Sequence, residues 1–227
     1  MQENCRWHCF DNDDQVAAAA CLQILDAAER AIAEHGVFKL VLAGGTTPVK
    51  VYRLLAQADA NWAKWVIYYG DERCLPRDHE ERNSLMVDQV LLRHVNIPAN
   101  QVHDIPAELG NVEGAKAYAK TLVGVPTFDI VLLGLGEDGH TASLFPNHAV
   151  DNSADAVPVF NSPKPPAERV TMSQNRLNNT REVIFIVTGA GKQEAVDNWR
   201  NGVAIPATLI APDCGVNVYC FGVKLKP

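Results

Sequence analysis

The order of hydrophobic patterns along the chain constrains the fold more than any other feature. Short apolar runs typical of buried strands alternate with segments whose apolar residues recur at helical spacing. We predict strands over 39–45, 65–70, 128–136, 181–189 and 216–223, and helices over 12–35, 48–58, 83–95, 110–122 and 190–199. This alternation predicts an α/β fold: a doubly wound, mostly parallel, Rossmann-like sheet with helices on both faces and the chemistry at the carboxyl ends of the strands.

Length and charge limit the classes of function. The 227 residues, 47% of them hydrophobic, suffice for a packed core. We predict a single domain over 1–227, with the proline-rich stretch 158–169 as a linker or mobile flap. A net charge of −7 argues against nucleic-acid binding, which depends on Lys and Arg neutralising phosphates. An anionic small substrate would therefore need a local basic pocket.

The location of the protein and the state of its cysteines follow from what the sequence lacks. No stretch has the roughly 18 to 20 apolar residues of a membrane span, and the N-terminus does not follow the order of a secretory signal. We therefore expect a cytoplasmic protein that contacts no membrane. The six cysteines are scattered without the spacing of a metal site, so we expect unbridged thiols and no bound metal.

The segment GLGEDGHTASLFP contains a G-x-G-x-x-G pattern directly after the apolar run FDIVLL. In a dinucleotide-binding turn the third glycine lies inside a helix that continues for several turns. Here Pro146 follows Gly139 within two turns and would break such a helix. The sequence therefore favours a tight catalytic loop over a dinucleotide site.

His140 is the candidate catalytic residue of this loop. Histidine is the side chain best suited to proton transfer near neutral pH. Glu137 or Asp138 could accept a hydrogen bond from the imidazole and fix its tautomer, and the sequence does not decide between them. An isolated histidine on a turn would be an ordinary surface residue, but polar groups also follow three other strands.

A glycine-threonine turn follows the first of these strands. Gly44, Gly45, Thr46 and Thr47 lie between the strand and the next helix. Glycines let an anion approach the backbone amides, and the helix dipole favours negative charge there. The alternative is a plain turn in which Thr47 is the N-cap.

Charged residues follow the other two strands. Asp71 and Arg73 come directly after Gly70, where side chains can reach a cleft, although a charge run is more often a solvated loop. Lys192 lies at the start of a predicted helix after Gly189 and Gly191. A cation is disfavoured at a helix start, which suggests a bound anion that compensates it; a solvated lysine is the alternative.

Five motifs, in order along the chain, resemble the 6-phosphogluconolactonase family, which shares a superfamily with glucosamine-6-phosphate deaminase. They are LAGGTTP, YYGDERCLP with Asn83, FDIVLLGLGEDGHTASLFP, RVTMSQNRLNNTREVIFIVTGAGK and IPAT. GEDGHTASLFP is the most specific of them. The chain departs from the family pattern at AGGTTP, where a serine-rich SGGSTP is commoner, and at RVTMS, where R-x-T-L-T is commoner.

The resemblance implies hydrolysis of 6-phospho-D-glucono-1,5-lactone to 6-phosphogluconate, the second step of the oxidative pentose phosphate pathway, without a metal or an organic cofactor. It also implies that His140 activates water, and that the GGTT turn, Arg73 and Lys192 hold the phosphate with Arg169 near the pocket. The expected partner is a small sugar-phosphate lactone, and we expect a monomer or a weak dimer.

Two other functions remain open at this point. An amino-sugar phosphate isomerase or deaminase of the same superfamily would need a carboxylate base, and Asp71 could supply it. A non-catalytic sugar-phosphate sensor would bind the ligand without chemistry, but no basic helix-turn-helix is evident in the sequence.

Overall fold

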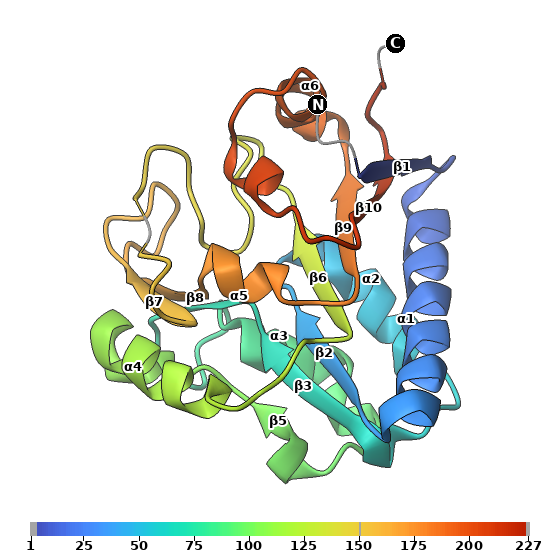
Figure 1. Ribbon diagram of the computed structural model, residues 1–227, viewed down its shortest axis with the longest axis vertical. Coiled ribbons are helices and arrows are strands. Elements are labelled where there is room, and N and C mark those ends of the chain that lie inside the picture. The colour runs from blue at the N-terminus through green and yellow to red at the C-terminus, as the bar shows by residue number, and fades with distance from the viewer. Residues whose placement is uncertain (1–3, 150, 226–227) are drawn as a thin grey trace.

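The main sheet of the molecule consists of seven strands (Figure 1). The computed structural model describes residues 4–149 and 151–225. The spatial order is β1-β10-β9-β6-β2-β3-β5, and every pairing is parallel. The strands are β1 (Cys5–Cys9), β2 (Phe38–Leu42), β3 (Trp65–Tyr69), β5 (Val102–His103), β6 (Ile130–Gly134), β9 (Val183–Thr188) and β10 (Val216–Phe221).

The winding of the chain creates a crevice at the centre of this sheet. From β2 the chain adds β3 and β5 on one side, and then it returns to place β6, β9 and β10 on the other side. The direction of winding therefore reverses between β2 and β6. In doubly wound sheets ligands bind at such a reversal, outside the carboxyl ends of the strands.

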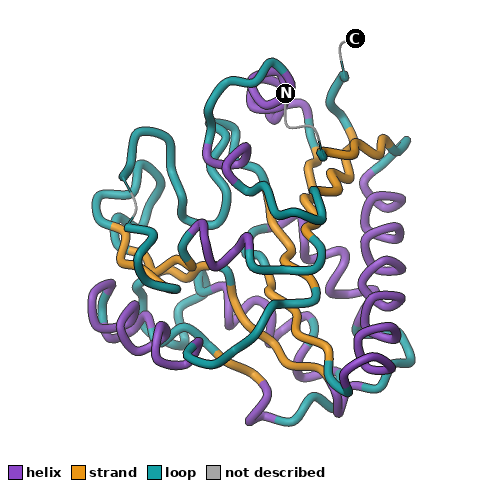
Figure 2. Tube along the Cα trace, viewed as in Figure 1, coloured by secondary structure: helices purple, strands orange, loops and turns teal. Residues whose placement is uncertain are grey.

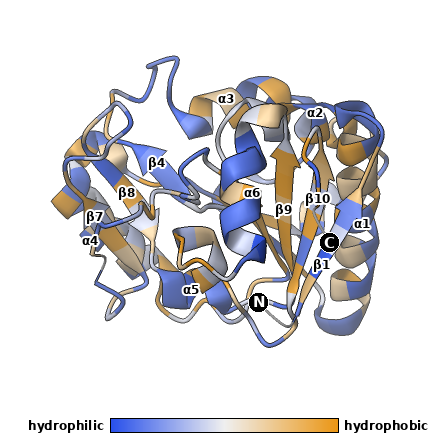
Figure 3. Ribbon diagram, turned by 90° about the horizontal axis from the view of Figure 1, so that it is seen from above, coloured by the Kyte–Doolittle hydropathy of each residue, from blue (hydrophilic) through white to orange (hydrophobic). Residues whose placement is uncertain are grey.

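Helices cover both faces of the sheet, as the alternating pattern predicted. They are α1 (Asp13–His35), α2 (Thr46–Leu55), α3 (Asn83–Val90), α4 (Asn111–Leu122), α5 (Gln174–Asn178) and α6 (Gln193–Arg200). In Figure 3, α1 and α2 lie on one side of β9 and β10, and α6 lies on the other. The central strands are buried and almost wholly apolar because helices exclude water from both of their faces.

The longest helix begins and ends where the sequence predicted. Asn12 caps α1, since its side-chain oxygen accepts a hydrogen bond of 2.8 Å from the amide of Gln15. The helix ends at Gly36, which adopts a left-handed conformation with φ 85°. No helix in the described part of the chain is both long and apolar enough to cross a membrane.

A second sheet, which the sequence did not predict, has three antiparallel strands in the order β4-β8-β7. They are β4 (Asp71–Arg73), β7 (Ala156–Val159) and β8 (Arg169–Met172). The expected charged loop at 71–73 is thus a strand, because β8 supplies its backbone partners from about a hundred residues away. The proline-rich stretch joins β7 to β8 within this sheet, so it is not a linker between domains.

A buried ion pair ties this second sheet to the N-terminus of α3. Glu72 is buried, and its carboxylate accepts hydrogen bonds from the amides of Arg73, Asn83 and Ser84 at 2.8 to 2.9 Å. Arg82 is buried beside it, with Nε 3.2 Å from Glu72 Oε2. A buried carboxylate is stable only when its oxygens are satisfied in this way.

We predict that Glu72→Gln lowers the free energy of unfolding by about 3–5 kcal/mol, since it breaks the buried pair and leaves Glu108 as the one ion-pair partner of the Arg82 guanidinium among the described residues. Denaturant titration followed by circular dichroism measures this change. Glu113→Gln is the control, because Glu113 forms an exposed ion pair with Lys116 and should leave the midpoint unchanged. Equal midpoints for Glu72→Gln and the wild type would contradict this role.

Candidate active site

A cleft of about 330 Å³ opens at the carboxyl ends of the central strands. Loops gather above these strand ends, where β2, β6 and β9 all point (Figures 1 and 2). The cleft brings together almost all of the residues selected from the sequence: Gly44, Gly45, Thr46, Thr47, Asp71, Arg73, Glu137, His140, Arg169 and Lys192. Asp138 lies just behind them, in hydrogen-bond contact with His140.

The loop after β6 is a tight turn that presents His140 to the cleft. The Gly136 amide donates a 2.8 Å hydrogen bond to the His140 carbonyl, and the Gly139 amide donates a 3.0 Å bond to the Gly136 carbonyl. Gly139 has φ 85°, a conformation that favours glycine. No helix is present in residues 135–149, so this segment is not a dinucleotide-binding turn.

Two neighbours fix the orientation of the His140 ring. Its Nδ1 lies 2.5 Å from Asp138 Oδ1, and the ring lies 4.7 Å from the buried ring of Phe145. The Nε2 atom has no hydrogen-bond partner within residues 4–149 and 151–225. Histidine is thus held at one nitrogen and free at the other, as a proton-transfer group requires.

Of the two carboxylates that the sequence left open, Asp138 holds the imidazole. Partial burial raises the pKa of Asp138, but hydrogen bonds from the His140 side chain and backbone outweigh this and lower it below the usual value. The Asp138 carboxylate therefore stays ionised near neutral pH and can accept the hydrogen bond of the imidazole. Glu137 also lines the cleft, with its carboxylate toward Gly191 in the turn after β9 rather than on the ring.

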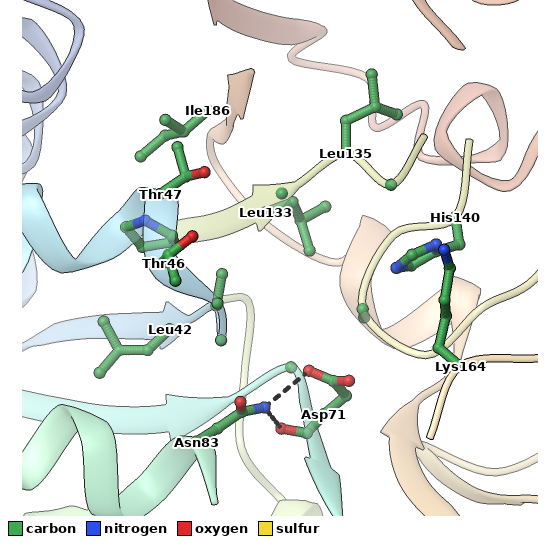
Figure 4. A pocket seen from close by; sticks show the side chains of 18 of the residues that line it. Leu42, Thr46, Thr47, Asp71, Asn83, Leu133, Leu135, His140, Lys164 and Ile186 are labelled. Atoms are coloured by element: carbon green, nitrogen blue, oxygen red, sulfur yellow. Dashed lines mark hydrogen bonds between the residues drawn. The ribbon is translucent and has the colours of Figure 1, made fainter. Parts of the chain in front are cut away.

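The N-terminus of α2 lies across the cleft from His140. Figure 4 shows Thr46 and Thr47 on one side and His140 with Lys164 on the other. The helix begins at Thr46, and its N-cap is Gly45 with φ 95° and no side-chain cap. Thr47 is therefore inside the helix, and the alternative that it is the N-cap is wrong. The uncapped amides and the helix dipole suit an anion.

Asp71 forms the floor of the cleft together with Asn83 (Figure 4). Asn83 Nδ2 donates to Asp71 Oδ1 at 3.2 Å, and Ser143 Oγ donates to Asp71 Oδ2 at 2.5 Å. The other side of Asn83 packs on Gly44, where a Cβ would lie 2.0 Å from Asn83 Oδ1. Both oxygens of Asp71 are therefore engaged by protein donors.

Four cationic side chains line the cleft, and they differ in how they are held. They are Arg73, Lys164, Arg169 and Lys192. The two lysine ammonium groups have no hydrogen bond or ion pair to the described residues, so they are available to a ligand. Arg73 Nη1 donates a hydrogen bond to the Glu81 carbonyl at 2.5 Å, so one nitrogen of its guanidinium is held by the protein.

Arg169 donates hydrogen bonds to backbone carbonyls of the proline-rich segment. Its Nη2 donates to the carbonyls of Pro165 at 2.7 Å and Lys164 at 3.2 Å, and its Nε donates to Pro166 at 3.3 Å. The segment is thereby fixed with Lys164 at the cleft. Lys164 was missed in the sequence because nothing in a proline-rich connection indicates which wall of a cleft it will reach.

The family model described as glucosamine-6-phosphate isomerases/6-phosphogluconolactonase matches residues 11–219. The chain belongs to this family.

Relatives of this family support the resemblance that the motifs indicated. The 6-phosphogluconolactonase of Mycobacterium tuberculosis is 37% identical over 217 residues, which cover 87% of this chain and 88% of the relative. The structure of 6-phosphogluconolactonase from Thermotoga maritima superposes with a TM-score of 0.88 at 25% identity, covering 97% of this chain and all of the other. That of the Trypanosoma brucei enzyme superposes with a TM-score of 0.86 at 28% identity, covering 95% of each.

Gly136 lets the His140 ring lie against the backbone in this family member. A Cβ at position 136 would lie 2.0 Å from His140 Nδ1 and 2.6 Å from Asp138 Oδ1. We predict that Gly136→Ala displaces the ring and breaks its bond to Asp138 while the sheet stays folded. NMR of the His140 ring measures the displacement. Gly134→Ala is the control, since a Cβ there meets no atom within 4 Å; an unshifted ring in Gly136→Ala would contradict the packing.

Proposed function

We propose that the protein hydrolyses 6-phospho-D-glucono-1,5-lactone to 6-phospho-D-gluconate, the second step of the oxidative pentose phosphate pathway. Family membership and the 6-phosphogluconolactonase relatives support this reaction. The single observation that carries it is the pairing of His140, held by Asp138 at Nδ1, with an uncapped helix N-terminus across the same cation-lined cleft. One end of the cleft suits proton transfer and the other suits a phosphate.

The phosphate is held at the side of the cleft formed by the N-terminus of α2. The uncapped amides of Gly45, Thr46 and Thr47 donate hydrogen bonds to the anion, and the Lys192 ammonium group neutralises it. Arg73 adds a further guanidinium donor at the cleft wall. Binding at this remote group orients the lactone ring so that its C1 lies beside His140.

His140 acts first as a base and then as an acid. Its Nε2 takes a proton from water as the water oxygen attacks C1, and a tetrahedral oxyanion forms. When this intermediate collapses, the bond between C1 and the ring oxygen breaks, and the imidazolium returns its proton to the ring oxygen. Asp138 stabilises the imidazolium between the two steps without taking the proton itself.

The reaction as drawn needs no metal and no organic cofactor, because a lactone is an activated ester. We also propose a cytoplasmic protein that acts as a monomer or a weak dimer on this small substrate, without nucleic acid.

The site gives less support to the two other functions. A deaminase would need Asp71 as a free carboxylate base, but both of its oxygens are bound by Asn83 and Ser143 in a buried position. We assign Asp71 to bracing the cleft floor. A sensor would not need the oriented imidazole, and it would bind 6-phosphogluconate without accelerating lactone opening.

The reaction is tested by following lactone hydrolysis coupled to 6-phosphogluconate dehydrogenase, with a chelator present. We expect a rate far above spontaneous hydrolysis that the chelator does not lower. A rate equal to the protein-free control would overturn the proposed function, and ammonia release from glucosamine 6-phosphate would identify a deaminase instead.

We predict that His140→Ala lowers kcat by roughly 10²- to 10⁴-fold with little change in KM, since it removes a general base but no phosphate contact. Steady-state kinetics corrected for spontaneous hydrolysis measure the change. His94→Ala is the matched control, because His94 is exposed and outside the cleft. Wild-type turnover in His140→Ala would exclude this role.

We predict that Lys192→Ala raises KM for the phosphorylated lactone by roughly 10- to 100-fold, which is the value of one charge-assisted hydrogen bond. The same variant should act on unphosphorylated glucono-1,5-lactone like the wild type, since that substrate makes no use of the ammonium. Lys116→Ala, on the outer surface, should change neither value. Equal losses on both lactones would show that Lys192 does not bind the phosphate.

A further inference from the structure

Two cysteines that the reaction does not use lie in contact at the edge of the main sheet. Cys9 at the end of β1 is directly opposite Cys220 in β10, and their sulfurs are 3.4 Å apart. Both thiols are free, as are the other four. No other pair of cysteine sulfurs in residues 4–149 and 151–225 is in hydrogen-bond contact.

The backbone geometry of this pair is compatible with a covalent bond. Neighbouring strands lie roughly 4.7–4.9 Å apart, and disulfides join Cα atoms that are roughly 4.4–6.8 Å apart. The sulfurs therefore need to approach only by side-chain rotation, without a change of strand register. We infer that Cys9 and Cys220 form a dithiol site that small-molecule disulfides oxidise to an intramolecular disulfide.

The different burial of the two thiols sets the order of the reaction. Cys9 is exposed, whereas Cys220 is 1% exposed, so only Cys9 can meet a reagent from solution. Burial, together with the hydrogen bond and charge of Cys9, raises the pKa of Cys220 to about 12. Cys9 is thus the attacking thiol, and Cys220 is the resolving thiol.

The oxidation proceeds by two thiol–disulfide exchanges. The Cys9 thiolate attacks one sulfur of a disulfide R–S–S–R, forms a mixed disulfide, and releases one R–S⁻. Cys220 then loses its proton and attacks Cys9 Sγ, which forms the Cys9–Cys220 bond and releases the second R–S⁻. Two protein thiols are oxidised, one small disulfide is reduced to two thiols, and the two protons pass to the released thiolates.

The bond would tie the edge strand β1 to β10, the neighbour of β9. β1 is the outermost strand of the sheet on this side. β10 ends at Phe221, whose carbonyl accepts a 2.9 Å hydrogen bond from Gly189 in the turn that carries Lys192. A bridge between positions 211 residues apart restricts the unfolded chain strongly, so the oxidised form should be the more stable one.

The test uses the full chain and glutathione disulfide as the oxidant. After oxidation, the remaining thiols are alkylated, and mass spectrometry counts them and maps the bridged peptides. We expect two fewer alkylated thiols than in the reduced protein and a linked peptide that contains Cys9 and Cys220. The thermal midpoint should rise by several degrees, and dithiothreitol should return it to the value of the reduced protein. An unchanged thiol count, or a bridge between other cysteines, would overturn the inference.

Single substitutions separate the two roles. In Cys220→Ser, Cys9 should remain as a mixed disulfide with glutathione, because no second thiol resolves it. In Cys9→Ser, Cys220 should stay reduced, because it is buried. Cys214→Ser, which removes another exposed thiol, should still form the bridge. Circular dichroism confirms folding, and oxidation of Cys220 in Cys9→Ser would contradict the assignment. These readouts are independent of lactone hydrolysis.

Discussion

The parallel pairing of β3, β2, β6 and β9 is the constraint on which the site depends. Parallel strands all end at the same edge of a sheet, and the crossover helices between them leave that edge free. The four segments that follow these strands therefore meet, although they lie up to about 150 residues apart in the chain. Backbone hydrogen bonding between strands thus sets the distance between the His140 imidazole and the uncapped N-terminus of α2.

The polar groups around this edge fall into two classes. One class is buried and held by protein partners through hydrogen bonds or ion pairs: Glu72, Arg82, Asp71 and Arg169. They hold the second sheet, the start of α3 and the proline-rich segment in place. The ammonium groups of Lys164 and Lys192 have no such partners among the described residues. The satisfied charges position the walls of the cleft, and the unsatisfied ones are left for a ligand.

Close backbone approach at two glycines completes the arrangement. Gly136 leaves room for the His140 ring, and Gly44 leaves room for Asn83. Each contact packs a glycine in the turn after a strand against a side chain that lines the cleft. The Cys9 and Cys220 thiols lie outside the cleft, on the edge strand β1 and its neighbour β10. Their oxidation can therefore occur without displacing the His140 imidazole.

The sequence by itself determined the α/β fold, five of the seven strands of the main sheet and their parallel direction, the ends of α1 and the turns that carry His140, Thr46 and Lys192; β1 and β5 were not predicted. These features depend on local patterns: hydrophobic periodicity, caps and glycines are readable within a few residues. Only the tertiary structure decided that residues 71–73 form a strand, that Asp138 rather than Glu137 holds the imidazole, and that Lys164 reaches the cleft. Each of these depends on a partner distant in the chain or on the direction of one side chain in a turn. The spacing of residues along the chain encodes neither the distant partner nor the side-chain direction, because packing between elements determines both.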